Sequence, residues 1–207
     1  EEKNSPGGGG VSLHPSECDD SKKKEESMKP RGPLMIEHRL IEKMLGLAAR
    51  ELDRIRSEGK ADPVYVDTLV DFIRIYADRT HHGKEEDILF RELEAKSMES
   101  ADRERMRELV EDHVTARKAV RDLVEGNRRY RAGDETGLAV IVEKLSFLIG
   151  FYPEHIRKED KVFFPDTERY FSTEELDRML EEFWEFDRRM IHEKYQNLYK
   201  SLAERYL

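Results

Sequence analysis

Two ten-residue segments of this chain repeat the same arrangement of histidine, lysine, glutamate and phenylalanine. They run from His81 to Phe90 (HHGKEEDILF) and from His155 to Phe164 (HIRKEDKVFF). In both, a lysine follows the first histidine by three positions, a glutamate by four, a second acid by five and a phenylalanine by nine. Residues four apart lie on one face of an α-helix, so each segment, if helical, places an imidazole beside a carboxylate. That spacing is typical of metal ligands.

The repeat extends to two further histidines. The acid-histidine pairs Glu37-His38 and Asp112-His113 are 75 residues apart, and the two ten-residue segments are 74 residues apart. The nearly equal offsets indicate that the chain contains two copies of one helical hairpin. The ionisable residues are kept between the copies, while the others differ.

Apolar residues recur at helical spacing through most of the chain, and histidines belong to the same series. The stripe from Leu34 to Ile55 keeps its spacing only if His38 is counted. A second helix is predicted over about 63–96, with Asp62 as N-cap and Pro63 at its first position. A third begins near 100–102, a turn region spans 126–134, and a fourth carries the series on to His155 and Glu159. We therefore predict an all-α, up-down-up-down four-helix bundle.

The two ends of the chain differ from this central part. Residues 1–32 combine a glycine run, charges and prolines, and are expected to form a flexible tail. Residues 33–170 form the predicted bundle domain. Residues 171–207 begin with a capping box, Ser172 with Glu175, and form a long additional helix that packs on the bundle or mediates a homodimer.

Composition excludes several classes of function. The net charge is -9 and the acidic and basic residues are interleaved, which argues against a nucleic-acid partner. The only cysteine is Cys18, so no intrachain disulfide forms. We find neither an apolar N-terminal region nor an apolar stretch of membrane-spanning length, so we expect a cytoplasmic protein without a membrane partner.

In such a bundle the starts of the first and third helices lie beside the ends of the second and fourth, so all the repeated histidines and glutamates reach one layer. Burying carboxylates and imidazoles there costs several kcal/mol per charge, of the order of the roughly 5 to 15 kcal/mol by which domains are stable. Cations remove that cost. Imidazole nitrogen with carboxylate oxygen, without thiolate, suits iron or manganese and also zinc, and carboxylates able to bridge favour a dinuclear site.

These motifs resemble the hemerythrin family, in particular its bacterial and archaeal HHE cation-binding branch, over roughly residues 34–170. The resemblance implies two iron ions joined by an oxo or hydroxo bridge. It also implies that Glu85 and Glu159 bridge the ions and that His38, His81, His113 and His155 are terminal ligands.

One position departs from the family pattern. Oxygen-carrying hemerythrins have a His-x-x-x-His pair on the third helix, whereas Arg117 follows His113 by four residues here. We consider three replacements for the missing ligand: His82 first, then Tyr152, then an open or water-filled coordination position.

Two further glutamates also follow a histidine by four residues. Glu42 follows His38, and Glu86 follows His82. Both lie off the main stripes, so we expect them to be solvated rather than to bind metal.

The resemblance permits several functions. We expect a non-haem di-iron protein that binds dioxygen, nitric oxide or peroxide as a sensor, carrier or scavenger. The alternatives are a di-iron oxidase or peroxidase, in which Tyr152 takes part in electron transfer, and an iron-handling module without turnover. Whether the chain is an enzyme is left open.

Overall fold

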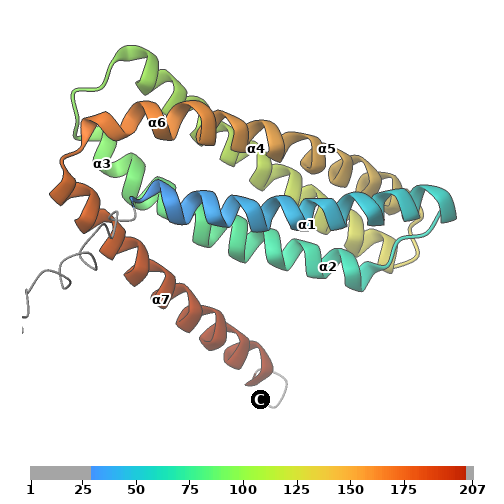
Figure 1. Cartoon of the computed structure of the whole chain (residues 1–207). Coiled ribbons are helices and arrows are strands. Elements are labelled where there is room, and N and C mark those ends of the chain that lie inside the picture. Colours follow the sequence, from blue (N-terminus) through green and yellow to red (C-terminus); the bar gives the residue numbers. More distant parts are fainter. Residues whose placement is uncertain (1–28, 204–207) are drawn as a thin grey trace, which may run out of the picture.

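Four helical rods form the body of the molecule in the computed structural model, which describes residues 29–203, with side chains described as far as Met190 and at Lys194. The first rod is α1 (Arg31–Glu58), and the second joins α2 (Pro63–Phe72), η1 (Ile73–His82), η2 (Glu85–Phe90) and α3 (Arg91–Glu94). The third is α4 (Ser100–Arg131), and the fourth joins α5 (Thr136–Lys158), η3 (Glu159–Phe163), α6 (Phe164–Thr167) and η4 (Glu168–Tyr170). Successive rods run in opposite directions (Figure 1), which confirms the predicted all-α bundle.

The helix boundaries follow local signals, with one correction. The Asp62 carboxylate accepts hydrogen bonds from the backbone N–H groups of Val64 (2.9 Å) and Tyr65 (3.3 Å), which confirms the predicted cap. The predicted turn region from residue 126 is wrong, because α4 continues to Arg131. Glycine is needed here because α4 and α5 approach closely: a Cβ on Gly137 would lie 2.5 Å from the carbonyl oxygen of Gly126.

Wide helical turns occur at both repeated segments. η1, η2 and η3 are π-helical, with hydrogen bonds that span five residues instead of four; the N–H of Gly83, for example, bonds the carbonyl of Asp78. A wider turn rotates the chain less per residue, so the neighbours His81 and His82 both face inward, each 1% exposed. The sequence analysis did not anticipate these turns, which place a second histidine in the layer.

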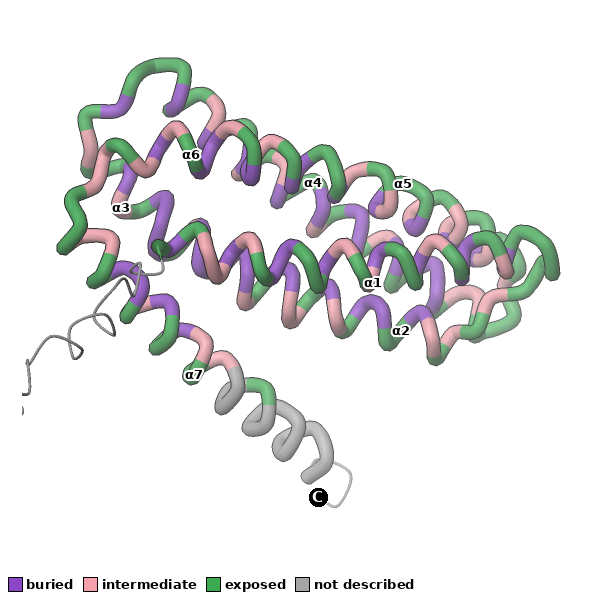
Figure 2. Tube along the Cα trace, in the orientation of Figure 1, coloured by how far each residue is buried: buried purple, intermediate pink, exposed green. Residues whose placement is uncertain are grey.

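The apolar core is divided into two clusters by a layer of polar side chains. One cluster fills the bundle from Ile41 to Ile55 and from Val66 to Ala77, with the facing parts of α4 and α5. The other surrounds Leu34, Phe90 and Phe163 at the opposite end. Figure 2 shows the buried faces of the rods directed toward one another along the bundle. The histidines and glutamates of the repeat lie between the two clusters.

The final helix, α7 (Thr173–Ala203), runs obliquely to the four rods (Figure 1). Its predicted capping box is confirmed: Ser172 N–H donates to the Glu175 carboxylate (2.9 Å), and Glu175 N–H donates to the Ser172 hydroxyl (3.3 Å). Phe183 and Phe186 are buried against the second cluster. α7 therefore packs on the bundle, and a homodimer through it stays a prediction.

One expectation about apolar stretches needs correction. Within the described residues, the helical stretch Thr136–Tyr170 is long and apolar enough, by length and composition alone, to cross a membrane. The core helix of a bundle has the same composition, and here Ile141, Leu145 and Leu148 are buried in the first cluster.

At the N-terminal end, α1 begins at Arg31, inside the segment predicted as a tail. Residues 1–28 lie outside the described part.

Candidate metal centre

All seven residues proposed as metal ligands meet in the polar layer, where they form two groups of donor atoms. Within each group the donor atoms lie within 4.8 Å of one another, and every member is buried. The first group consists of His38, His81, Glu85 and Glu159, and the second of His82, Glu85, His113 and His155. We call these groups position 1 and position 2.

The two glutamates face both positions. Oε1 of Glu85 lies 3.5 Å from Nε2 of His81, and its Oε2 lies 3.4 Å from Nε2 of His113. Oε2 of Glu159 lies 3.2 Å from Nε2 of His38, and its Oε1 lies 3.2 Å from Nε2 of His155. Each carboxylate thus presents one oxygen to each position, as a ligand bridging two cations does.

The outer nitrogen of each repeated-segment histidine bonds a carboxylate of the same hairpin. Nδ1 of His81 lies 2.9 Å from the Glu37 carboxylate, and Nδ1 of His155 lies 3.3 Å from that of Asp112. These acids precede His38 and His113 in the chain. A carboxylate at Nδ1 holds the proton there and leaves Nε2 with a lone pair that can bind a cation. In the structure, Nε2 of His81 lies 2.8 Å from Nε2 of His38.

The histidines of α1 and α4 use carboxylates of the opposite hairpin. Nδ1 of His38 lies 2.8 Å from Asp160, and Nδ1 of His113 lies 2.6 Å from Glu86. The expectation that Glu86 is solvated is therefore wrong. Glu86 lies in the π-helical turn η2 and reaches α4, where it holds the ligand candidate His113 from outside the two donor groups. Glu42 matches expectation, since it is 38% exposed and pairs with Arg39.

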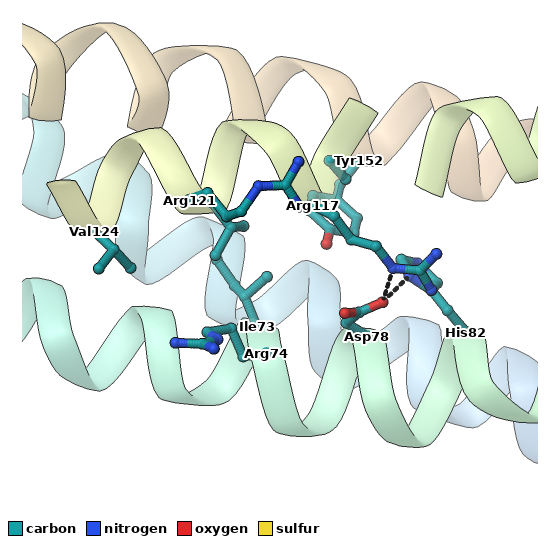
Figure 3. Close-up of a pocket in the computed structure, with 10 residues that line it drawn as sticks. Ile73, Arg74, Asp78, His82, Arg117, Arg121, Val124 and Tyr152 are labelled. Carbon is teal, nitrogen blue, oxygen red and sulfur yellow. Dashed lines mark hydrogen bonds and ion pairs between the residues drawn. The ribbon is translucent and has the colours of Figure 1, made fainter. Parts of the chain in front are cut away.

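Of the three replacements considered for the missing third-helix histidine, His82 has a ring nitrogen in one of the two donor groups. Its ring stacks on that of His113, with centroids 3.8 Å apart, and its Nε2 belongs to position 2. Its Nδ1 lies 3.3 Å from Asp78, as drawn in Figure 3. Arg117 donates to Asp78 (2.7 Å) and to Glu86 (2.7 Å), the acids that hold His82 and His113. Arg117 therefore contacts the acids that hold two ligand candidates.

Tyr152, the second candidate, lies behind His82, with ring centroids 6.2 Å apart and nearly parallel planes. Both side chains line a pocket of about 280 Å³ between η1 and α4 (Figure 3). Its walls include Ile73, Val120 and Val124. The pocket therefore borders position 2 at His82.

The protonation tendencies of the layer reflect its need for positive charge. Burial lowers the pKa of His38, but the hydrogen bond to Asp160 and the nearby charge of Glu159 raise it to about 10. Burial likewise opposes, but does not prevent, a raised pKa at His113 beside Glu159 and Glu85. Burial and the neighbouring imidazoles hold the pKa of His82 well below its usual value. Burial raises the pKa of the Glu159 carboxyl, but His155, His113 and His38 hold it well below its usual value. Bound cations would supply the positive charge that these histidines supply here.

The donor atoms fit bound cations. Seven buried atoms of the layer have no hydrogen-bond partner among the described residues: both oxygens of Glu85, both of Glu159, and Nε2 of His82, His113 and His155. Leaving buried polar atoms unpaired costs about 1 to 3 kcal/mol each. Because all seven point into positions 1 and 2, two cations would satisfy them together.

The sequence analysis assigned no role to the outer carboxylates Glu37, Asp112, Asp160 and Asp78. The first three belong to the conserved part of the internal repeat, so the repeat held a signal for them. Asp78 lies outside the repeat, and no sequence signal marks it.

Fold and site define a helical-bundle protein with a buried histidine-carboxylate centre for metal cations. The chain belongs to the hemerythrin family: the family model described as the hemerythrin HHE cation-binding domain matches residues 33–167. Comparisons with curated proteins and with solved structures gave no significant match. The assignment to the bacterial and archaeal branch stays a prediction.

Proposed function

We propose that this protein holds two iron ions in positions 1 and 2 and reversibly binds a small ligand, such as dioxygen, nitric oxide or peroxide, as a sensor, carrier or scavenger. The observation that carries the proposal is the pair of buried donor groups with two carboxylates shared between them. Manganese and zinc share the preference for these donors. A cytoplasmic location stays a prediction.

The two positions differ in the number of donors that the chain supplies. Position 2 has three imidazoles, from His82, His113 and His155, whereas position 1 has two, from His38 and His81. Both positions share the bridging carboxylates, so position 1 has one protein donor fewer. Fewer protein ligands leave room for an external one, and we therefore assign small-ligand binding to position 1. A bound iron pair supplies Lewis acidity and electron transfer there.

The chain contributes rigidity and exclusion of water. Each of the five histidines is held at Nδ1 by a carboxylate, and each of those carboxylates contacts a lysine or arginine. Phe164 stacks near His38, with centroids 6.0 Å apart. Donors that are fixed in this way lose little entropy when a cation binds.

The first test is the metal content of protein expressed in iron-supplemented medium, combined with ultraviolet-visible spectra. We expect about two irons per chain, as the two donor groups require, and near-ultraviolet bands that change reversibly on reduction and on exposure to air. The matched control is the variant Glu85→Gln, which keeps the size of the shared side chain and removes its charge. An intact fold that takes up neither iron, manganese nor zinc contradicts the proposal.

Tyr152 favours a second candidate function, that of an oxidase or peroxidase. Its ring is 2% exposed and stacks on the ligand candidate His82 beside the pocket. Burial raises the pKa of its phenol, which keeps the proton on the oxygen. Catalytic consumption of peroxide or dioxygen that falls in Tyr152→Phe, at unchanged metal content, would favour the enzyme; a stable, reversible adduct without turnover would favour the binding protein.

A further inference from the structure

α7 covers one copy of the internal repeat and not the other. At the third position of the repeated segments, Gly83 stands in the first and Arg157 in the second. A Cβ on Gly83 would lie 2.7 Å from the ring of Phe186, so the absent side chain makes room for this residue of α7. Arg157, by contrast, is 61% exposed and pairs with Glu154.

The lysines of the two copies show the consequence. Lys158 binds Asp112 (2.7 Å) and is 43% exposed. Lys84, its counterpart, binds Glu37 but is completely buried, because α7 lies over it and supplies Asp187, whose Oδ1 is 2.8 Å from Nζ. A buried ammonium needs more than one favourable contact to offset its loss of water. Asp187 gives it a second carboxylate.

Lys84 and Glu37 link α7 to a metal-ligand candidate. The Glu37 carboxylate contacts Lys84 through one oxygen and Nδ1 of His81 through the other, at 2.9 Å. A carboxylate at Nδ1 fixes the ring orientation and tautomer of a ligand histidine. The contacts therefore form one chain, from Asp187 through Lys84 and Glu37 to His81, which ends at position 1.

We propose that Asp187 is a positioning residue for position 1, and that α7 makes the two metal positions unequal. This inference rests on the proposed function, because it requires two bound cations. With α7 docked, the His81 ring is held ready for the cation. Since coupling between two equilibria is reciprocal, a cation in position 1 also favours docked α7. The carboxylates that hold the position 2 histidines are Asp78, Glu86 and Asp112, and they pair with Arg117 and Lys158 of the bundle rods.

The test is a titration of the metal-free, full-length chain with Co²⁺, followed by its visible bands. Altering an outer partner of a ligand histidine typically costs 10- to 100-fold in metal affinity, and Asp187 acts through two intermediaries. We therefore expect Asp187→Asn to weaken one of two equivalents by about tenfold, the lower end of that range, and to leave the other unchanged. Asp187→Glu should restore the affinity of the weakened equivalent.

The matched control is Glu182→Gln, on the same helix. Glu182 binds Arg91 of the bundle at 2.9 Å, so it also ties α7 down, but outside the chain of contacts to His81. This variant should bind both equivalents as the unaltered protein does. Trp184, the single tryptophan, lies half-exposed on α7, and its fluorescence should change as a cation fills position 1.

Three results would overturn the inference. The first is an Asp187→Asn variant that binds both equivalents normally, the second is an equal loss of affinity at both, and the third is the same change in Glu182→Gln. An unaltered chain that binds fewer than two Co²⁺ ions would overturn the proposed function itself, and the inference with it.

Discussion

Removing the metal should destabilise this protein by a large part of its total stability. A ligand that binds only the folded state adds about 4 kcal/mol to the free energy of unfolding at a free concentration of 1,000 times its dissociation constant. The structure offers two positions, so two ions would add about 8 kcal/mol under these conditions. For a chain of this size, 1 kcal/mol shifts Tm by about 2 to 4 °C, so chelation should lower Tm by about 16 to 32 °C.

The reason lies in the polar layer. Without cations, Glu85 and Glu159 keep four buried oxygens with no hydrogen-bond partner among the described residues, and three imidazole nitrogens face them. The stability that is lost on metal removal should therefore come mainly from the polar layer and from the two apolar clusters beside it.

The assay is thermal unfolding of the loaded protein, of the protein after chelation and dialysis, and of the same sample after metal is added back. The double variant Glu85→Gln, Glu159→Gln serves as control, because its Tm should no longer respond to the chelator. A metal-loaded protein whose Tm is the same before and after chelation would refute the reasoning, since the layer would then be satisfied without cations.

Three further predictions follow from the site and the helix ends. His82→Ala should lower the affinity for one of two bound ions by more than about 100-fold, a larger effect than loss of an outer partner. Adding Arg117→His should recover part of that affinity. A metal titration that finds two tightly bound ions in His82→Ala would show that His82 is not a ligand. Asp62→Ala should cost about 1 kcal/mol in denaturant unfolding, as loss of an N-cap does, and an altered metal content would contradict this purely local role. In the metal-free chain, protonated His38 stabilises the fold fully below its unfolded pKa of about 6.5, and this contribution should be lost as the pH rises to the folded pKa of about 10. Tm should therefore fall over that range, and a Tm that rises instead would reverse the sign assigned to His38.

The proposed asymmetry between positions 1 and 2 gives α7 a place in function. Position 1 has fewer protein donors and is the one linked to α7 through Asp187. A ligand that alters position 1 would therefore alter the contact that holds α7, as a sensor requires.

The helices and their inward faces were predictable from the sequence, because helical periodicity is a local property. The stripes placed His38, His81, His113 and His155 in one layer, and the internal repeat added Glu85 and Glu159. Asp62 and the Ser172 capping box were equally predictable, since a cap involves residues within three positions of one another.

Only the tertiary structure determined which side chains on those faces contact one another. The π-helical turns that bring His82 beside His81 depend on packing in the layer and leave no periodic signal of their own. Arg117 holds the partners of His82 and His113, and Glu86 holds a histidine of the other hairpin. All of these contacts join residues of separate rods. Asp187 reaches Lys84 from 103 positions away. Local sequence specifies which side chains face inward. Which of them meet is determined by the packing of rods that are distant in the chain, because each buried charge must find an oppositely charged partner on another rod.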